Sequence, residues 1–354
     1  MRILKFKKDE LHPFLKRISE EAELWAPAKK YSDRHIFKKI EDLSEIDLDY
    51  TRTLLPPRKI FLPPSFNMFN VDEEGYREDF SHATPKILFG IHACDIHGLR
   101  ILDAFFAQTF DDPYHSQARK NTLLIGHSCW PDEHCLCKST GTHVIEEGYD
   151  LFFSELESYY LVWIGSSRGD DLVRMKEDSF DENISDKDIQ AYTRWREERD
   201  KAFKAEINFI AMPDLLELKY RDDPLWEKLD TACLSCGSCS NVCPTCNCYN
   251  VMDKPYLNTV GSDINRCWDA CTLVEYSEVA GGENFREKRS DRLRLWYTHK
   301  LQAYISKYGK PACVGCGRCV ITCPVDINIF SVAQSLAGKD VDTFWNRLHR
   351  EVRK

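Results

Sequence analysis

The middle of the chain alternates short apolar runs with a stretch whose apolar residues recur at helical spacing. The apolar runs cover residues 86–91 (KILFGI) and 121–126 (NTLLIG), and each has the length of a buried strand. Residues 95–106, between them, place their apolar side chains on one helical face. Two further runs, 149–156 and 159–164, predict a hairpin or two separate strands. Strands that alternate with helices predict an α/β sheet.

The pattern is less regular on both sides of this region. Residues 9–26 have apolar positions at helical spacing and predict one helix. Four prolines between residues 56 and 64 then break regular structure. The charge-dense residues 188–204 predict a solvated helix, and the last twenty residues predict a short amphipathic helix. From about residue 215 the chain becomes rich in cysteine.

The length of 354 residues exceeds one small module at roughly 150 residues per domain. We expect four segments: a mixed segment at 1–84 that packs on the α/β domain, an α/β domain at 85–210, a mainly helical ferredoxin-like dicluster domain at 211–335 with a long insertion at 244–312, and a helical tail at 336–354.

Composition narrows the class of protein. Hydrophobic residues make up 43% and charged residues 30%, both near globular averages. A net charge of −9 argues against a nucleic-acid-binding surface. We expect no membrane span and a cytoplasmic protein, because no run of about eighteen apolar residues and no secretory apolar segment occurs. In a reducing cytosol the sixteen cysteines favour metal binding over disulfides.

One cysteine motif occurs twice, as CLSCGSCSNVCP (233–244) and CVGCGRCVITCP (313–324). Both read C-x2-C-x2-C-x3-C-P, the bacterial ferredoxin run for a 4Fe–4S cluster, whose fourth cysteine binds the other cluster of the pair. The closely spaced cysteines wrap three corners of a cubane, and the proline fits the first turn of the helix that follows. Zinc, which prefers C-x2-C pairs, is the alternative. The predicted ligands are Cys233, Cys236, Cys239 and Cys323 for one cluster, and Cys313, Cys316, Cys319 and Cys243 for the other.

Four further cysteines belong to the α/β region. Cys94 follows the first predicted strand, Cys129 follows the second, and Cys135 and Cys137 lie on the next loop. Ligands at the ends of neighbouring strands converge at the carboxyl edge of a sheet. These four thiols fit a third 4Fe–4S cluster, with scattered buried cysteines and a zinc site as the alternatives.

The insertion contains the last four cysteines: Cys246, Cys248, Cys267 and Cys271. The spacing of Cys267 and Cys271 is i, i+4, which would put both on one face of a helix. A fourth cluster is one interpretation. Buried structural thiols, thiols next to a cluster, and a reactive or regulatory role are the others.

Several polar residues near the cysteines are candidates for secondary roles. We expect the histidines to be surface or hydrogen-bonded residues, with His134 as a possible ligand or proton donor: His92, His97, His127, His134 and His143. We expect Asp95 to cap the following helix, and Asp132 and Glu133 to be solvated. Arg318 is either a solvated surface residue or a charge that raises a cluster potential.

Five segments, in this order, resemble one family of iron–sulfur proteins: ACDIHGLRILDAFF (93–106), HSCWPDEHCLCKSTGT (127–142), CLSCGSCSNVCPTCNC (233–248), WDACTLVEYSEVAGG (268–282) and CVGCGRCVITCP (313–324). The family comprises the iron–sulfur electron-transfer subunit of anaerobic sulfite reductase and the beta subunit of cytosolic NAD(P)-linked sulfhydrogenases, which are nickel–iron hydrogenases. The resemblance covers about residues 85–330. Cys246, Cys248 and Cys271 recur in its pattern, whereas Cys267 is particular to this sequence.

The resemblance implies a non-catalytic electron-transfer subunit of a soluble complex. A flavin-containing NAD(P)H oxidoreductase subunit with FAD and NAD(P) would dock on it, and a separate catalytic subunit would receive or supply the electrons. The resemblance also favours the third cluster at Cys94, Cys129, Cys135 and Cys137. The segment CVGCGRCVITCPVDI favours a hydrogenase partner over a sulfite or sulfur reductase. A reductase that uses the N-terminal cluster itself, with His134 or His127 as proton donor, is a further alternative.

Overall fold

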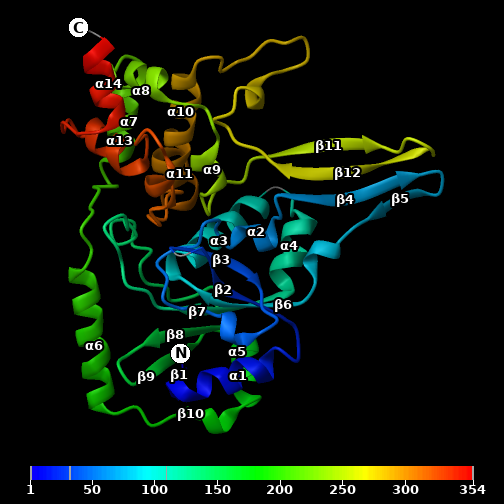
Figure 1. The fold of residues 1–354 in the computed structure, drawn as a ribbon, viewed down its shortest axis with the longest axis vertical. Coiled ribbons are helices and arrows are strands. Elements are labelled where there is room, and N and C mark those ends of the chain that lie inside the picture. The colour runs from blue at the N-terminus through cyan, green and yellow to red at the C-terminus, as the bar shows by residue number, and fades with distance from the viewer. Residues whose placement is uncertain (1, 32, 109, 353–354) are drawn as a thin grey trace.

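The computed structural model describes residues 2–31, 33–108 and 110–352. Its lower part in Figure 1 is an α/β unit built on a large sheet, and its upper part is a group of helices that includes the C-terminal helix. A β-sheet arm projects to one side between them (Figure 1). No helix among the described residues is both long and apolar enough to cross a bilayer.

The large sheet has eight strands in the order β10-β1-β9-β8-β7-β6-β2-β3. Its strands are β1 (Arg2–Lys7), β2 (Glu23–Tyr31), β3 (Arg34–Lys39), β6 (Lys86–Ile91), β7 (Thr122–His127), β8 (Leu151–Glu155), β9 (Tyr159–Ile164) and β10 (Phe180–Asp181). The central strands β2, β6, β7 and β8 are parallel, and the outer strands are antiparallel to their neighbours. All six residues of β6 are buried, as expected of an interior strand that is covered on both faces.

Helices cover both faces of this sheet, and each face has its own apolar core. One core packs side chains of α1 and α5 against the strands, and the other packs side chains of α3. The helices of the α/β unit are α1 (Leu11–Ile18), α2 (Arg58–Phe61), α3 (Ala93–Phe106), α4 (Pro113–Lys120), α5 (Ser167–Arg174) and α6 (Asp186–Lys201).

Most strands and helices predicted in the middle of the chain are present, and β8 and β9 pair as a hairpin. The single helix predicted over residues 9–26 is wrong. Only Leu11–Ile18 is helical, and the chain from Glu23 onward forms β2. Leu24 is buried as part of that strand, so its apolar character reflects the sheet and not a helix face. Strands β1, β2 and β3 therefore belong to the same sheet as β6 and β7.

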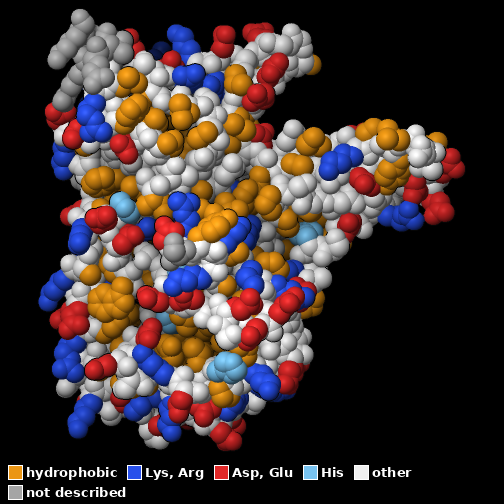
Figure 2. Space-filling view, in the orientation of Figure 1, with side chains coloured by type: hydrophobic (Ala, Val, Ile, Leu, Met, Phe, Trp, Pro, Cys, Tyr) orange, Lys and Arg blue, Asp and Glu red, His pale blue; other side chains and the backbone are white. Residues whose placement is uncertain are grey.

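The arm is a four-stranded sheet in the order β11-β12-β4-β5 (Figure 1). It joins two hairpins that lie far apart in the sequence: β4 (Ser65–Asp72) with β5 (Gly75–Glu78), and β11 (Tyr249–Pro255) with β12 (Gly261–Trp268). The second hairpin lies inside the insertion, so the region expected to be mainly helical also contains two strands. Apolar, basic and acidic side chains all reach the surface of the arm (Figure 2).

The helical part forms the third apolar core, and several cysteines pack against it. Its helices are α7 (Met212–Lys219), α8 (Leu225–Ala232), α9 (Ser238–Asn241), α10 (Arg289–Thr298), α11 (Tyr304–Tyr308), α12 (Arg318–Thr322), α13 (Ile329–Leu336) and α14 (Phe344–Val352). A π-helical turn, His299–Ala303, joins α10 to α11. This core holds together the two loops that carry the repeated cysteine motif.

Candidate iron–sulfur centres

The first thiol group combines three cysteines of the first motif with the last cysteine of the second motif. Its members are Cys233, Cys236, Cys239 and Cys323. Burial is the main cause that raises the pKa of Cys239 to about 12, and the charges of the other three thiols add to the rise. The same burial and neighbouring charges raise the pKa of Cys323. The structure thus brings together the four side chains that the predicted exchange assigns to one cluster.

The second thiol group has the reciprocal composition. Its members are Cys313, Cys316, Cys319 and Cys243. Burial raises the pKa of Cys313 to about 12, with further contributions from the charges of Cys243 and Cys316. Burial and the charges of the other three members raise the pKa of Cys319. The two groups are therefore neighbours that exchange one cysteine each.

The two motif loops have the same backbone course. Each enters its short helix through a glycine in the left-handed conformation, with φ of 72° at Gly237 and 75° at Gly317. This conformation costs a residue with a side chain more than it costs glycine. The helices that follow, α9 and α12, pack against each other. The equivalent turns and paired helices place the two groups side by side.

The N-terminal thiol group lies at the carboxyl edge of the parallel strands. Cys94 is in the first turn of α3 directly after β6, Cys129 follows β7, and Cys135 and Cys137 are buried on the next loop. A hydrogen bond with Cys135, burial and the charges of Cys94 and Cys129 all raise the pKa of Cys137. The four predicted thiols therefore share one buried environment, drawn from three separate segments.

The N-terminal thiol group borders the second thiol group directly. The amide of Leu136 donates to the carbonyl of Gly315 at 2.7 Å, and Thr142 Oγ1 donates to the carbonyl of Val314 at 2.7 Å. Arg52 spans both groups, because Nε donates to the carbonyl of Cys316 at 3.0 Å and Nη2 lies 3.2 Å from Cys135 Sγ. The three groups thus follow one another in the order N-terminal, second, first.

A buried ion pair lies at the same border. Arg318 donates to the two carboxylate oxygens of Asp95 at 2.6 and 2.8 Å, and both side chains are at most 2% exposed. Arg318 Nε also donates to the carbonyl of Thr53 at 2.9 Å. The cap role expected for Asp95 and the surface role considered for Arg318 are both wrong. Asp95 does not cap α3 because its carboxylate neutralises a cation that the dicluster helix α12 buries.

A second ion pair joins Arg52 to Asp132. Burial opposes ionisation of Asp132, but the hydrogen bonds and charge of Arg52 outweigh it and lower the pKa of Asp132 to about 2. Asp132 is therefore only partly solvated, because its carboxylate pairs with Arg52, whereas Glu133 is exposed. Asp132 orients the arginine that contacts both the second and the N-terminal thiol groups.

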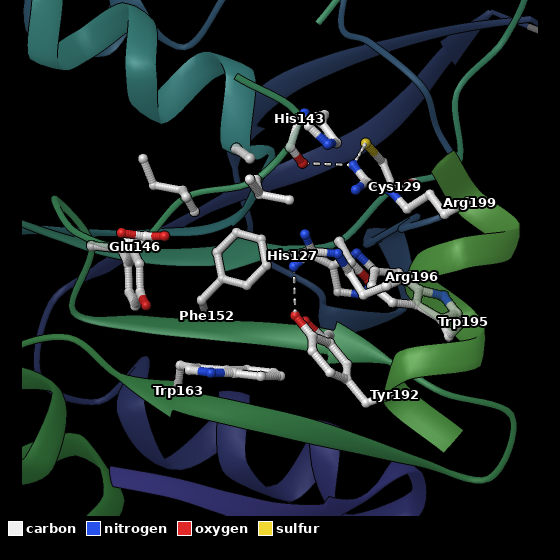
Figure 3. A pocket seen from close by; sticks show the side chains of 16 residues that line it. His127, Cys129, His143, Glu146, Phe152, Trp163, Tyr192, Trp195, Arg196 and Arg199 are labelled. Atoms are coloured by element: carbon white, nitrogen blue, oxygen red, sulfur yellow. Dashed lines mark hydrogen bonds between the residues drawn. The ribbon is translucent and has the colours of Figure 1, made fainter. Parts of the chain in front are cut away.

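A cavity of about 170 Å³ opens beside Cys129, between α6 and the β8–β9 hairpin (Figure 3). Arg199 reaches from α6 to its edge, where it donates to the carbonyl of Cys129 at 2.6 Å and to that of His143 at 2.8 Å (Figure 3). His127 lines the cavity, is 1% exposed, and has no hydrogen-bond partner on either ring nitrogen. Burial lowers the pKa of His127 to about 4, so its ring is neutral at pH 7.

Two other histidines follow the expectation of a hydrogen-bonded residue. His92 Nδ1 lies 3.2 Å from the carbonyl of Thr51, and His97 Nε2 lies 2.8 Å from that of Val144. The side chain of His134 is 38% exposed, and its Nε2 lies 3.6 Å from Glu133.

Three of the four cysteines of the insertion lie close together, and the fourth lies elsewhere. A hydrogen bond with Cys271 is the main cause that lowers the pKa of Cys248 to about 6, and the charges of Cys246 and Cys248 act on Cys271. Cys267 lies apart on β12, where its thiol is 3.3 Å from Ser65 Oγ. The structure therefore does not bring together the four cysteines that a fourth cluster of the predicted composition requires.

The donor set of the three thiol groups fits 4Fe–4S clusters. Thiolate is the usual protein ligand of such clusters. Among the described residues, no three His, Cys, Asp or Glu side chains converge at the spacing of a single metal ion. Each group also has a buried cation for which the structure records no carboxylate partner: Arg292 at the first group, Lys300 and Arg58 at the second, and Arg199 at the N-terminal group. An anionic cluster would supply the missing negative charge.

These cations and Arg52 are functional candidates that the sequence did not reveal. Each comes from a segment distant from the cysteines that it contacts or approaches. Arg58, for example, donates to the carbonyl of Asn241 at 3.2 Å, although the two residues are 183 positions apart in the sequence. No motif or spacing marks them, because only the tertiary fold brings them to the thiols.

Two comparisons with known proteins identify a domain of this chain and a relative of nearly its whole length. Residues 232–327 match the family described as a 4Fe-4S dicluster domain. A protein of Pyrococcus furiosus named Sulfhydrogenase 2 subunit beta is 37% identical over 331 residues, which cover 92% of this chain and 96% of that protein. The similarity thus extends over the α/β unit as well as the two cysteine motifs.

Proposed function

The chain belongs to the family of sulfhydrogenase beta subunits, and from that premise we propose that it relays electrons between two partner subunits of one complex. It is an iron–sulfur electron-transfer subunit with a 4Fe–4S dicluster domain. One partner is a flavin-containing NAD(P)H oxidoreductase subunit with FAD and NAD(P). The other is a catalytic subunit of the hydrogenase type, with a sulfite or sulfur reductase as the alternative.

The row of three thiol groups is the observation that carries this proposal. The first and second groups share exchanged cysteines, and the N-terminal group touches the second group through Leu136 and Gly315. Clusters arranged in such a row transfer single electrons from one to the next, and this transfer needs no substrate pocket. The clusters supply one-electron redox chemistry, and the chain supplies ligands, burial and charge that set their potentials.

The two ends of the row differ in their surroundings. The first thiol group includes Cys236, which is exposed, whereas Cys135 and Cys137 of the N-terminal group are buried. Cys129, at the N-terminal end, borders the cavity that holds His127 and Arg199. We propose that one partner docks at each end, so that electrons cross the whole row.

The experiment that tests the relay is the iron and acid-labile sulfide content of the anaerobically purified chain, combined with EPR of the reduced state. About twelve irons per chain are expected for three cubanes. About eight irons would account for only two clusters. That result would show that the N-terminal thiol group holds no cluster, and it would overturn a relay of three clusters. A matched control is Cys267→Ser, which should leave the iron content unchanged because Cys267 lies apart from the thiol groups.

A second candidate is a reductase reaction at the N-terminal group. The cavity beside Cys129, lined by the buried His127, favours this alternative. Four cysteine ligands leave no open iron, so the relay fits the donor set better. The reductase proposal requires the chemically reduced chain to turn over sulfite or polysulfide without any partner. The relay proposal requires a catalytic subunit for any turnover.

A further inference from the structure

Lys300 is buried near Cys243 of the second thiol group and near Cys246 of the insertion, and the structure records no carboxylate partner for it. The residue belongs to the π-helical turn and is 4% exposed. Nζ donates to Thr245 Oγ1 at 2.9 Å and lies 6.0 Å from the centroid of the Trp296 ring. The backbone of Lys300 is tied to the same group, because its carbonyl accepts the amide of Cys313 at 3.1 Å.

Arg58 lies near Cys246 and Cys243 and is 2% exposed. Its guanidinium stacks on Trp268 at 3.8 Å and donates to backbone carbonyls, among them that of Asn241. Its Nε has no hydrogen-bond partner. Arg58, like Lys300, makes none of its recorded contacts with a carboxylate. The second thiol group therefore has two buried cations for which the structure records no carboxylate partner.

The other two thiol groups each have one such cation. Arg292 approaches the first group through Ser235 Oγ at 2.9 Å, and its remaining contacts are backbone carbonyls. Arg199 contacts the N-terminal group directly, because its Nε donates to the carbonyl of Cys129 at 2.6 Å and its Nη2 lies 3.9 Å from Cys129 Sγ. Two more arginines lie near the second group, but a carboxylate neutralises each of them, Asp132 for Arg52 and Asp95 for Arg318. The second group thus has the larger positive excess.

Reduction of a cluster adds one negative charge to it. A nearby buried cation stabilises the reduced form more than the oxidised form, and the effect is large where solvent is excluded. Thiolate ligation is the same in all three groups, so the difference in unneutralised cations distinguishes their potentials.

We propose that Lys300 and Arg58 make the cluster of the second thiol group the first of the three to be reduced. This inference rests on the proposed relay function. The cluster of the second thiol group, in the middle of the row, then holds the electron. The clusters of the first and the N-terminal thiol groups exchange electrons with the partners. Lys300 and Arg58 are positioning residues, because they act on the cluster through its electrostatic surroundings.

The test is an EPR-monitored redox titration of the full chain, wild type against Lys300→Met. The first signal to appear on reduction should shift to a more negative potential. We expect at least a tenfold loss in the equilibrium constant for reduction, which corresponds to about 59 mV for a one-electron couple. The other signals should stay within error. Lys307→Met is the matched control, because Lys307 is exposed further along the same helical segment and contacts Gln108.

A second variant separates charge from structure. Lys300→Arg changes the shape of the side chain but keeps its positive charge, so it should shift the first signal much less than Lys300→Met does. Equal shifts in the two variants would assign the effect to packing and overturn the inference. An unchanged first signal in Lys300→Met would also overturn it.

Cys319→Ser provides a test that does not need Lys300 to be replaced. Cys319 belongs to the second thiol group, so this variant should lack the first signal that wild type shows. A first signal that persists in Cys319→Ser would overturn the assignment. These outcomes differ from a failure of the relay itself, which would appear as missing iron in the wild-type chain.

Discussion

The dicluster loops and the N-terminal thiol group hold the same kind of ligand set by different means. In the dicluster region, three cysteines of each group come from one short loop, and only the fourth is exchanged. In the N-terminal group, the four cysteines come from the end of β6, the end of β7 and a separate loop. The first arrangement is encoded locally, whereas the second depends on a parallel sheet that aligns its strand ends.

The difference predicts how each region depends on its cluster. The motif loops are short and pack on small helices such as α9 and α12, so bound iron contributes to their folding. The N-terminal cysteines sit on a sheet with two apolar cores of its own. That sheet has enough buried surface to fold without a cluster. Bound iron should therefore contribute redox activity there and add little to the free energy of unfolding.

The largest expected effect comes from removing one ligand in each region. Cys319→Ser should lose about four irons and unfold the dicluster region in part, because the loops lose the centre that orders them. Cys129→Ser should lose about four irons while the rest of the chain keeps its fold and about eight irons. Iron analysis and thermal unfolding followed by circular dichroism measure both effects. Equal loss of structure in the two variants would remove the contrast between the regions.

The next largest effect is expected at the buried ion pair that joins the regions. Asp95→Ala leaves Arg318 buried without a counter-charge, and breaking such a pair costs about 3–5 kcal/mol. The free energy of unfolding, from denaturant titration at pH 7, measures this cost. Asp342→Ala, which breaks an exposed pair with Arg347, is the control and should cost less than about 1 kcal/mol. Similar costs for the two variants would show that the Asp95 pair adds nothing to the junction.

The same contrast explains how far the sequence could be interpreted. The grouping of the motif cysteines was predictable, because the repeated motif and its spacing indicate it. The strands at 86–91 and 121–126 were predictable too, because a buried parallel strand is a continuous apolar run. The first strands were not, since Leu24 fits a helix face and a buried strand equally well at this length. Nothing local indicates that β4 pairs with β12, or that Arg58 and Arg199 reach the thiols, because these contacts join segments far apart in the chain.

The third prediction concerns the α/β unit alone. Asp188 accepts hydrogen bonds from Ser185 and Tyr159 and pairs with Lys5, and these contacts hold its pKa well below the usual range of a carboxyl group. Asp188→Ala should cost about 2 kcal/mol at pH 7, the upper range for a lost helix cap.

The pH dependence of this cost has a definite sign. The depressed pKa gives stability that is fully present above the unfolded value of about 4 and is lost as the pH falls below it. The difference between wild type and Asp188→Ala in denaturant titrations should therefore shrink as the pH falls from 5 to 3. A difference that stays constant over this range would show that the charge of Asp188 is not what stabilises the cap. The EPR signals of the dicluster region should not change in this variant at pH 7.

The smallest expected effect tests a single contact between the two regions. Thr142 Oγ1 donates to the carbonyl of Val314 at 2.7 Å, and Thr142 is 5% exposed. Thr142→Val keeps the shape of the side chain but leaves that buried carbonyl without its donor, which should cost about 1 kcal/mol, the lower end for an unsatisfied buried group. Thr193→Val is the control, because the hydroxyl of Thr193 is exposed and bonds only within α6. Denaturant titration of both variants should show a loss for Thr142→Val and almost none for Thr193→Val. If the two regions held together through the buried ion pair alone, Thr142→Val would unfold at the same denaturant concentration as wild type.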